Sequence, residues 1–147
     1  MLFRSVEKVK QVLGSLKAKK IAALGLAYKP DVDDLRESPA TEVVHLLQKE
    51  EVHVKVWEPF KPEANVQDID MATSLDSAIQ DADLILLLVK HTEFTNIQPD
   101  EIASKTRARV LIDCVNGWNT IQWENNGFTV YRLGVNNLKI ANQQSQI

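Results

Sequence analysis

Short apolar runs that alternate with helical segments constrain this chain most. The uninterrupted run at Asp83–Val89 is typical of a strand buried on both faces of a parallel sheet. Four further segments have the β-branched, apolar or alternating residues of strands: Lys20–Leu24, Val52–Trp57, Arg109–Asp113 and Phe128–Leu133. Helical spacing or capping signals lie around and between these segments: residues 4–18, 41–50, 74–80, 99–105 and 120–126.

This order of elements predicts an α/β fold, because strands separated by helices pair in parallel through right-handed crossovers. We expect a Rossmann-like open parallel sheet of about five strands, flanked by helices and preceded by an N-terminal helix. Residues 1–18 would form that helix, residues 19–137 the Rossmann-like domain, and the Asn- and Gln-rich residues 138–147 a flexible tail. The basic run Lys17–Lys20 fits the solvated end of the first helix.

Composition narrows the function. A chain of 147 residues fits one domain of ordinary size. Its net charge of -3 argues against a general nucleic-acid surface, which needs a basic face. One cysteine excludes an intramolecular disulfide framework, and no apolar run is long enough to span a bilayer or to act as a secretion signal. A cytoplasmic location is the default expectation.

The turn after the first strand is the main candidate site. It extends from Gly25 to Ser38, whereas a turn that only reverses the chain needs two to six residues. Open α/β sheets bind ligands at the carboxyl ends of their strands, and this turn carries two cations, Lys29 and Arg36, among several carboxylates. Ser38 is a good N-cap for the helix that follows, with Pro39 at its first position.

The turn does not have the glycine pattern of a dinucleotide site, in which backbone approaches a pyrophosphate. Only Gly25 is present at the required positions. Glu58 ends the second strand, where a carboxylate can accept a ribose hydroxyl, but it follows Gly25 at more than the usual spacing. An exposed carboxylate at a strand end is the simpler interpretation of Glu58. We therefore do not expect this domain to hold a whole NAD by itself.

The sequence of the turn, G-L-A-Y-K-P-D-V-D-D-L-R-E-S-P-A, resembles the signature of the UDP-glucose/GDP-mannose dehydrogenases. In that family it opens the C-terminal domain, which binds the UDP part of a nucleotide sugar. The stretches Lys90–Phe94 and Asp113–Trp118 are similar to a narrower branch, the UDP-N-acetyl-D-mannosamine dehydrogenases. The resemblance covers roughly residues 18–135 and implies that this chain is part of a larger NAD-dependent enzyme.

The resemblance also implies roles for single residues. Tyr28 and Lys29 would contact the UDP-sugar, and Arg36 would reach the NAD held by a preceding domain. From the residues alone, Tyr28 could instead pack on the sheet edge, Lys29 could be a surface lysine, and Arg36 could form local ion pairs of little worth. The family's catalytic cysteine belongs to a region outside this chain, so we assign no catalytic residue and no metal ligand here. The full-length enzyme would be a homodimer.

Three residues qualify this assignment. Cys114 ends a strand, but a free cysteine is more often a small buried hydrophobe than a nucleophile. His91 follows the central strand and is a site candidate only through the family likeness. Much of the family has an arginine that contacts the ligand of a neighbouring subunit where this chain has Val115. Two alternatives stay open: a free-standing nucleotide- or protein-binding module without catalysis, and, because of Val115, a structural domain whose site has decayed.

Overall fold

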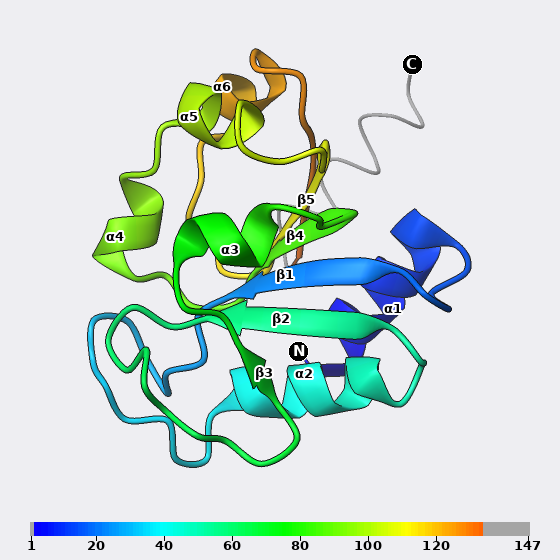
Figure 1. Ribbon diagram of the computed structural model, residues 1–147. Coiled ribbons are helices and arrows are strands. Elements are labelled where there is room, and N and C mark those ends of the chain that lie inside the picture. The colour runs from blue at the N-terminus through cyan, green and yellow to red at the C-terminus, as the bar shows by residue number, and fades with distance from the viewer. Residues whose placement is uncertain (1, 134–147) are drawn as a thin grey trace.

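The computed structural model describes residues 2–133, which form a parallel sheet between two layers of helices (Figure 1). The predicted tail at residues 138–147 lies outside this range. The helices and strands follow one another in this order: α1 (Leu2–Leu13), β1 (Lys20–Leu24), α2 (Pro39–Gln48), β2 (His53–Trp57), β3 (Asp70–Met71), α3 (Leu75–Ile79), β4 (Leu84–Leu87), α4 (Thr92–Thr95), α5 (Pro99–Ala103), β5 (Val110–Asp113), α6 (Thr120–Glu124) and β6 (Thr129–Arg132).

Within residues 2–133, the sheet has the strand order β3-β2-β1-β4-β5-β6, and every pair is parallel. This is the order of a doubly wound Rossmann sheet, so the predicted α/β fold is confirmed. The two-residue strand β3 was not predicted, because it is too short to show an alternating pattern. The order reverses between β1 and β4, which pair in register from Ile21 with Leu84 to Leu24 with Leu87.

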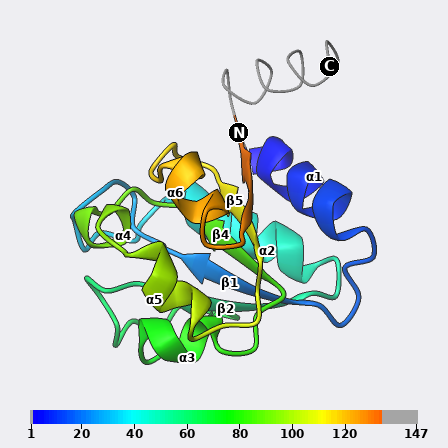
Figure 2. The same cartoon turned by 90° about the horizontal axis from the view of Figure 1, so that it is seen from above.

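Alternate residues of each central strand enter two separate cores. In β1, Ile21 and Ala23 pack in the core beneath α1 and α2, whereas Ala22 and Leu24 pack in the core with α3, α5 and α6. Figure 2 shows α1 and α2 on one side of the sheet and α3 and α5 on the other. Burial on both faces explains why the strands are almost wholly apolar. Among the described residues, none of the helices is long and apolar enough to cross a membrane.

The first helix is shorter than predicted. It ends at Leu13, because Gly14 adopts a positive φ of 73° and its N–H closes the last turn on the carbonyl of Lys10. The prediction that the basic run Lys17–Lys20 forms the end of this helix is therefore wrong. It lies in the connection to β1, and Lys20 is the first residue of that strand. The cap of α2 is as predicted, with the Ser38 hydroxyl accepting from the Ala40 N–H.

Candidate functional site

A pocket of about 430 Å³ lies at the carboxyl ends of β1, β4 and β5. This is the point where the strand order reverses and where successive connections leave for opposite faces of the sheet, the usual ligand crevice of open α/β folds. The α2 N-terminus closes one side of the pocket. Its lining comes from four segments: Ala27, Tyr28, Lys29 and Pro30 after β1, Pro39, Ala40 and Val43 in α2, Leu88, Val89 and Lys90 after β4, and Cys114 and Val115 after β5.

The structure brings two of the predicted site residues together in this pocket. Tyr28 and Lys29 both line it, and both side chains are exposed. Tyr28 is 56% exposed, so it is not packed against the sheet edge. The charged residues of the lining are Lys29 and Lys90, and the remaining lining is mostly apolar. Such a surface suits an anionic ligand that also carries a flat, partly apolar group.

Gly25 allows the first turn to start where it does. Its φ is +97°, and a Cβ at this position would lie 2.5 Å from the Cβ of Val89 and 3.1 Å from the backbone nitrogen of Val89. The end of β1 and the end of β4 thus approach too closely for any other residue. This contact sets the separation of the two loops that form the pocket.

Glu58 anchors the same turn through hydrogen bonds to its backbone. It has no exposed surface, and its Oε1 accepts from the N–H groups of Leu26 and Ala27 at 2.8 and 2.9 Å. Its Oε2 accepts from the N–H of Phe60 at 3.0 Å. Burial by itself raises the pKa of this carboxyl, but the donors from His91 and from the backbone outweigh burial and hold the pKa below its ordinary value.

The interpretation of Glu58 as an exposed carboxylate is therefore wrong. The side chain turns back toward the β1 loop, because the backbone N–H groups there point at the end of β2. In a dinucleotide fold such N–H groups face the pyrophosphate; here Glu58 accepts from Leu26 and Ala27 instead. The sequence signal that could have found this role is the acidic residue directly after the alternating strand.

His91 connects the two loops of the pocket. It is fully buried, and its Nε2 donates to Glu58 Oε1 at 3.0 Å while its Nδ1 accepts from the N–H of Asp31 at 2.8 Å. Asp31 in turn accepts from the N–H and the hydroxyl of Thr92, which lower the pKa of its carboxyl. His91 therefore does not line the pocket but braces the turn that carries Lys29. Sequence reasoning did not predict this role.

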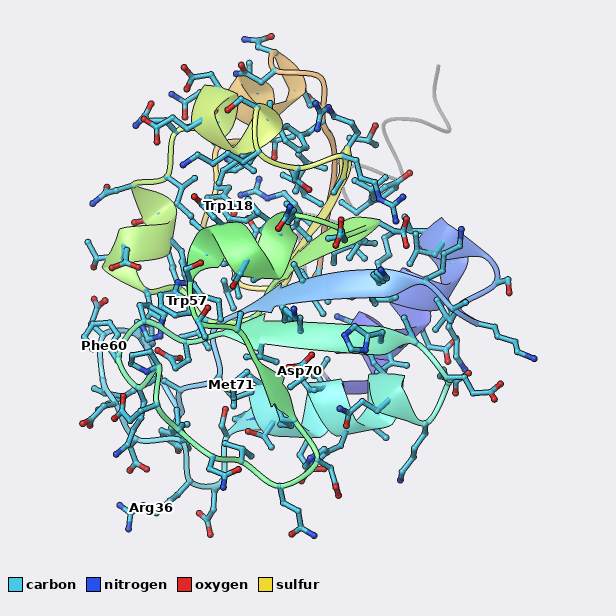
Figure 3. The ribbon with its side chains drawn as sticks, viewed as in Figure 1. Arg36, Trp57, Phe60, Asp70, Met71 and Trp118 are labelled. Atoms are coloured by element: carbon cyan, nitrogen blue, oxygen red, sulfur yellow. The ribbon has the colours of Figure 1, made fainter. Side chains whose placement is uncertain are left out.

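Arg36 lies apart from the pocket. It is 88% exposed, lines other hollows of the surface, and points outward at the rim of the molecule (Figure 3). Its guanidinium forms two hydrogen bonds of 3.0 Å with the carboxylate of Asp34. These bonds and the Arg36 N–H lower the pKa of Asp34 to about 2. Lys29 and Arg36, which belong to one turn, thus line different hollows, and Tyr28 lines one hollow with each of them.

The loop after β5 is organised by Asp113. This buried carboxylate accepts from the N–H groups of Val115, Gly117 and Trp118 at 2.9 to 3.1 Å. The Trp118 indole donates to the carbonyl of Phe94 at 2.8 Å. The stretch Asp113–Trp118 is therefore a structural motif. Burial raises the pKa of the Cys114 thiol to about 12, which agrees with the expectation that Cys114 is not a nucleophile.

The strand order and the crevice define a class of protein, the Rossmann-like α/β domains that bind a ligand at the topological switch point. A sequence model of the UDP-glucose/GDP-mannose dehydrogenase family, UDP binding domain, matches residues 22–120. The chain therefore belongs to the UDP-glucose/GDP-mannose dehydrogenase family, as its sequence predicted.

Several relatives that the chain matches are dehydrogenases of nucleotide sugars. The chain is 38% identical over 132 residues to the UDP-N-acetyl-D-mannosamine dehydrogenase of Methanocaldococcus jannaschii, covering 88% of this chain and 30% of that enzyme. It is 33% identical over 135 residues to the UDP-glucose 6-dehydrogenase of Rickettsia conorii, covering 88% and 31%. The solved UDP-N-acetyl-mannosamine dehydrogenase of Staphylococcus aureus is 28% identical with a TM-score of 0.72, covering 95% and 32%. The chain thus spans 30–32% of the length of these relatives.

Proposed function

We propose that this chain is the C-terminal UDP-binding domain of an NAD-dependent UDP-sugar 6-dehydrogenase, with UDP-N-acetyl-D-mannosamine as the substrate. The observation that carries the proposal is the switch-point pocket, in which Tyr28 and Lys29 of the family's signature turn lie side by side along the chain and line the same cavity. The 38% identity to a UDP-N-acetyl-D-mannosamine dehydrogenase supports this substrate.

In such an enzyme the C6 alcohol of the sugar is oxidised to a carboxylate, and NAD accepts the hydrides. The UDP lies at the far end of the substrate from C6. Lys29 would attract the diphosphate as a point charge, and Tyr28 would present its ring at the mouth of the pocket. Binding energy from this remote part of the substrate orients the reacting end.

The turn after β1 does not fit a whole dinucleotide, because Glu58 accepts from the N–H groups of Leu26 and Ala27. We therefore assign NAD to a preceding domain of the enzyme, together with the catalytic cysteine. Arg36 is the residue of this chain that would contact NAD, and its exposure at the rim of the domain suits a role at a domain interface. A homodimeric, cytoplasmic enzyme is part of the same proposal.

Calorimetric titration of the 147-residue chain with UDP and with NAD tests the proposal. UDP should bind with a dissociation constant on the order of 0.1–1 mM, because part of a site recovers only part of the binding energy. Lys29→Ala should weaken UDP binding by about 1–3 kcal/mol, the range for a lost charge-assisted contact. Arg36→Ala should leave it nearly unchanged and serves as the matched control.

Equal or tighter binding of NAD would contradict the proposal and would favour the alternative of a free-standing dinucleotide module. Loss of UDP binding in Arg36→Ala, with the fold intact by circular dichroism, would instead make Arg36 a phosphate ligand. The proposed contact of Arg36 with NAD would then be wrong.

A further inference from the structure

Lys90 is a second cation in the switch-point pocket. It follows β4, and it reaches the pocket from the opposite side of the strand-order reversal to Lys29, which follows β1. The family likeness of the stretch Lys90–Phe94 made His91 a site candidate and implied no role for Lys90. Since His91 is buried beneath the loops, Lys90 is the residue of that motif whose side chain is exposed at the cavity.

The backbone of Lys90 is held between two buried neighbours, while its ammonium group has no carboxylate partner among the described residues. On one side Val89 is buried against Gly25, and on the other His91 is buried against Glu58. The stem of Lys90 lies beside the β5 loop, where a Cβ on Gly117 would be at an ordinary contact distance of 3.5 Å from the Lys90 Cγ. Within residues 2–133, neither Lys29 nor Lys90 has a carboxylate within ion-pair distance.

We propose that Lys90 binds the diphosphate of the nucleotide sugar together with Lys29, an inference that rests on the proposed function. Two unpaired ammonium groups on separate loops match the charges of the two linked phosphates. Among the described residues, no Asp or Glu lines this cavity, so the charges at its surface are those of the two lysines.

The test is a titration of the 147-residue chain, followed by amide NMR shifts, with UDP and UMP as the probes. Lys90→Ala should weaken UDP binding about 5- to 50-fold, as expected for a lost charge-assisted contact. Its effect on UMP should be smaller, because UMP has one phosphate. Lys90→Arg should retain most of the affinity for UDP. Lys17→Ala, an exposed lysine before the amino end of β1, is the matched control and should bind like the unaltered chain.

Unchanged UDP affinity in Lys90→Ala overturns the inference, and the proposed function then stands on Lys29 alone. Equal losses for UDP and UMP overturn the assignment to the diphosphate. Failure of the unaltered chain to bind UDP overturns both the inference and the proposed function, so the two failures are distinguishable. The exposed position of Lys90 means that its variants should give the amide spectrum of the folded chain, which the same experiment records.

Discussion

Glu58 is the residue on which the geometry of the candidate site depends most. A carboxylate without exposed surface is costly unless its oxygens are satisfied, and here backbone N–H groups and His91 satisfy them. The result is a negative charge placed under the turn that presents Lys29. Exchange of this carboxylate tests whether the turn needs that charge.

Glu58→Gln should lower the free energy of unfolding at neutral pH by about 1–3 kcal/mol, because an amide NH₂ replaces one acceptor and opposes a buried donor. Urea unfolding of both chains measures this difference. Glu63→Gln, at an exposed carboxylate nearby, is the control and should have almost no effect. A stability equal to that of the unaltered chain would show that the Glu58 charge is dispensable.

The same variant has a pH signature. Folding lowers the pKa of Glu58, so the folded chain binds this proton less readily than the unfolded chain. The stabilisation from Glu58 is therefore complete above the ordinary carboxyl pKa, about 4.3, and is lost as the pH falls through the lower folded pKa. The unaltered chain and Glu58→Gln should converge in stability over that acidic range. A constant difference at all pH values would contradict the assigned pKa shift.

At the scale of elements, the ends of β1 and β4 are held at a distance that only glycine allows. The positive φ of Gly25 and the contact with Val89 act at one position, whereas Gly127, after α6, has a similar φ of +92° with open space around it. The two glycines therefore separate the cost of backbone conformation from the cost of a steric clash.

Gly25→Ala should destabilise the chain by roughly 2–5 kcal/mol, since backbone strain and overpacking add together. Gly127→Ala should cost only about 1–2 kcal/mol, the backbone strain alone. Denaturant unfolding of both variants gives the comparison. Similar losses in the two variants would show that β1 and β4 can separate without cost.

At the scale of the whole molecule, residues 2–133 form the switch-point pocket, whereas the turn after β1 and the cysteine thiol are both occupied by other contacts or buried. The described turn after β1 gives its Leu26 and Ala27 N–H groups to Glu58, and the Cys114 thiol is buried with a pKa of about 12. The relatives that the chain matches are roughly three times as long as the part it covers. In the proposed function we therefore assign the catalytic step to other parts of the enzyme.

The 147-residue chain should accordingly produce no NADH from UDP-N-acetyl-D-mannosamine, UDP-glucose or GDP-mannose. Absorbance at the NADH band, recorded with NAD and each sugar nucleotide in excess, measures this. Circular dichroism on the same sample establishes that the chain is folded. Turnover that persists through further purification would mean that this chain holds a complete active site.

The sequence by itself determined the α/β class, the family and the turn that carries Tyr28, Lys29 and Arg36, because apolar periodicity, capping residues and the signature motif are properties of neighbouring residues. It also predicted the Ser38 cap, which is local. Gly14 is also a local signal for the end of the first helix. The prediction extended past it because apolar residues continue at helical spacing to Leu16. The strand β3 was not predicted, because two residues are too few to show an alternating pattern.

Only the tertiary structure decided which residues share a surface. Lys29 and Lys90 line one pocket because β1 and β4 are neighbours in the sheet, although the segments are far apart in the chain. Glu58 and His91 became buried braces because strand order brings the end of β2 beside the end of β1 and near the β4 loop. Arg36 separates from Lys29 because the long turn carries it to the rim. Burial and proximity depend on strand order, which a local pattern does not encode.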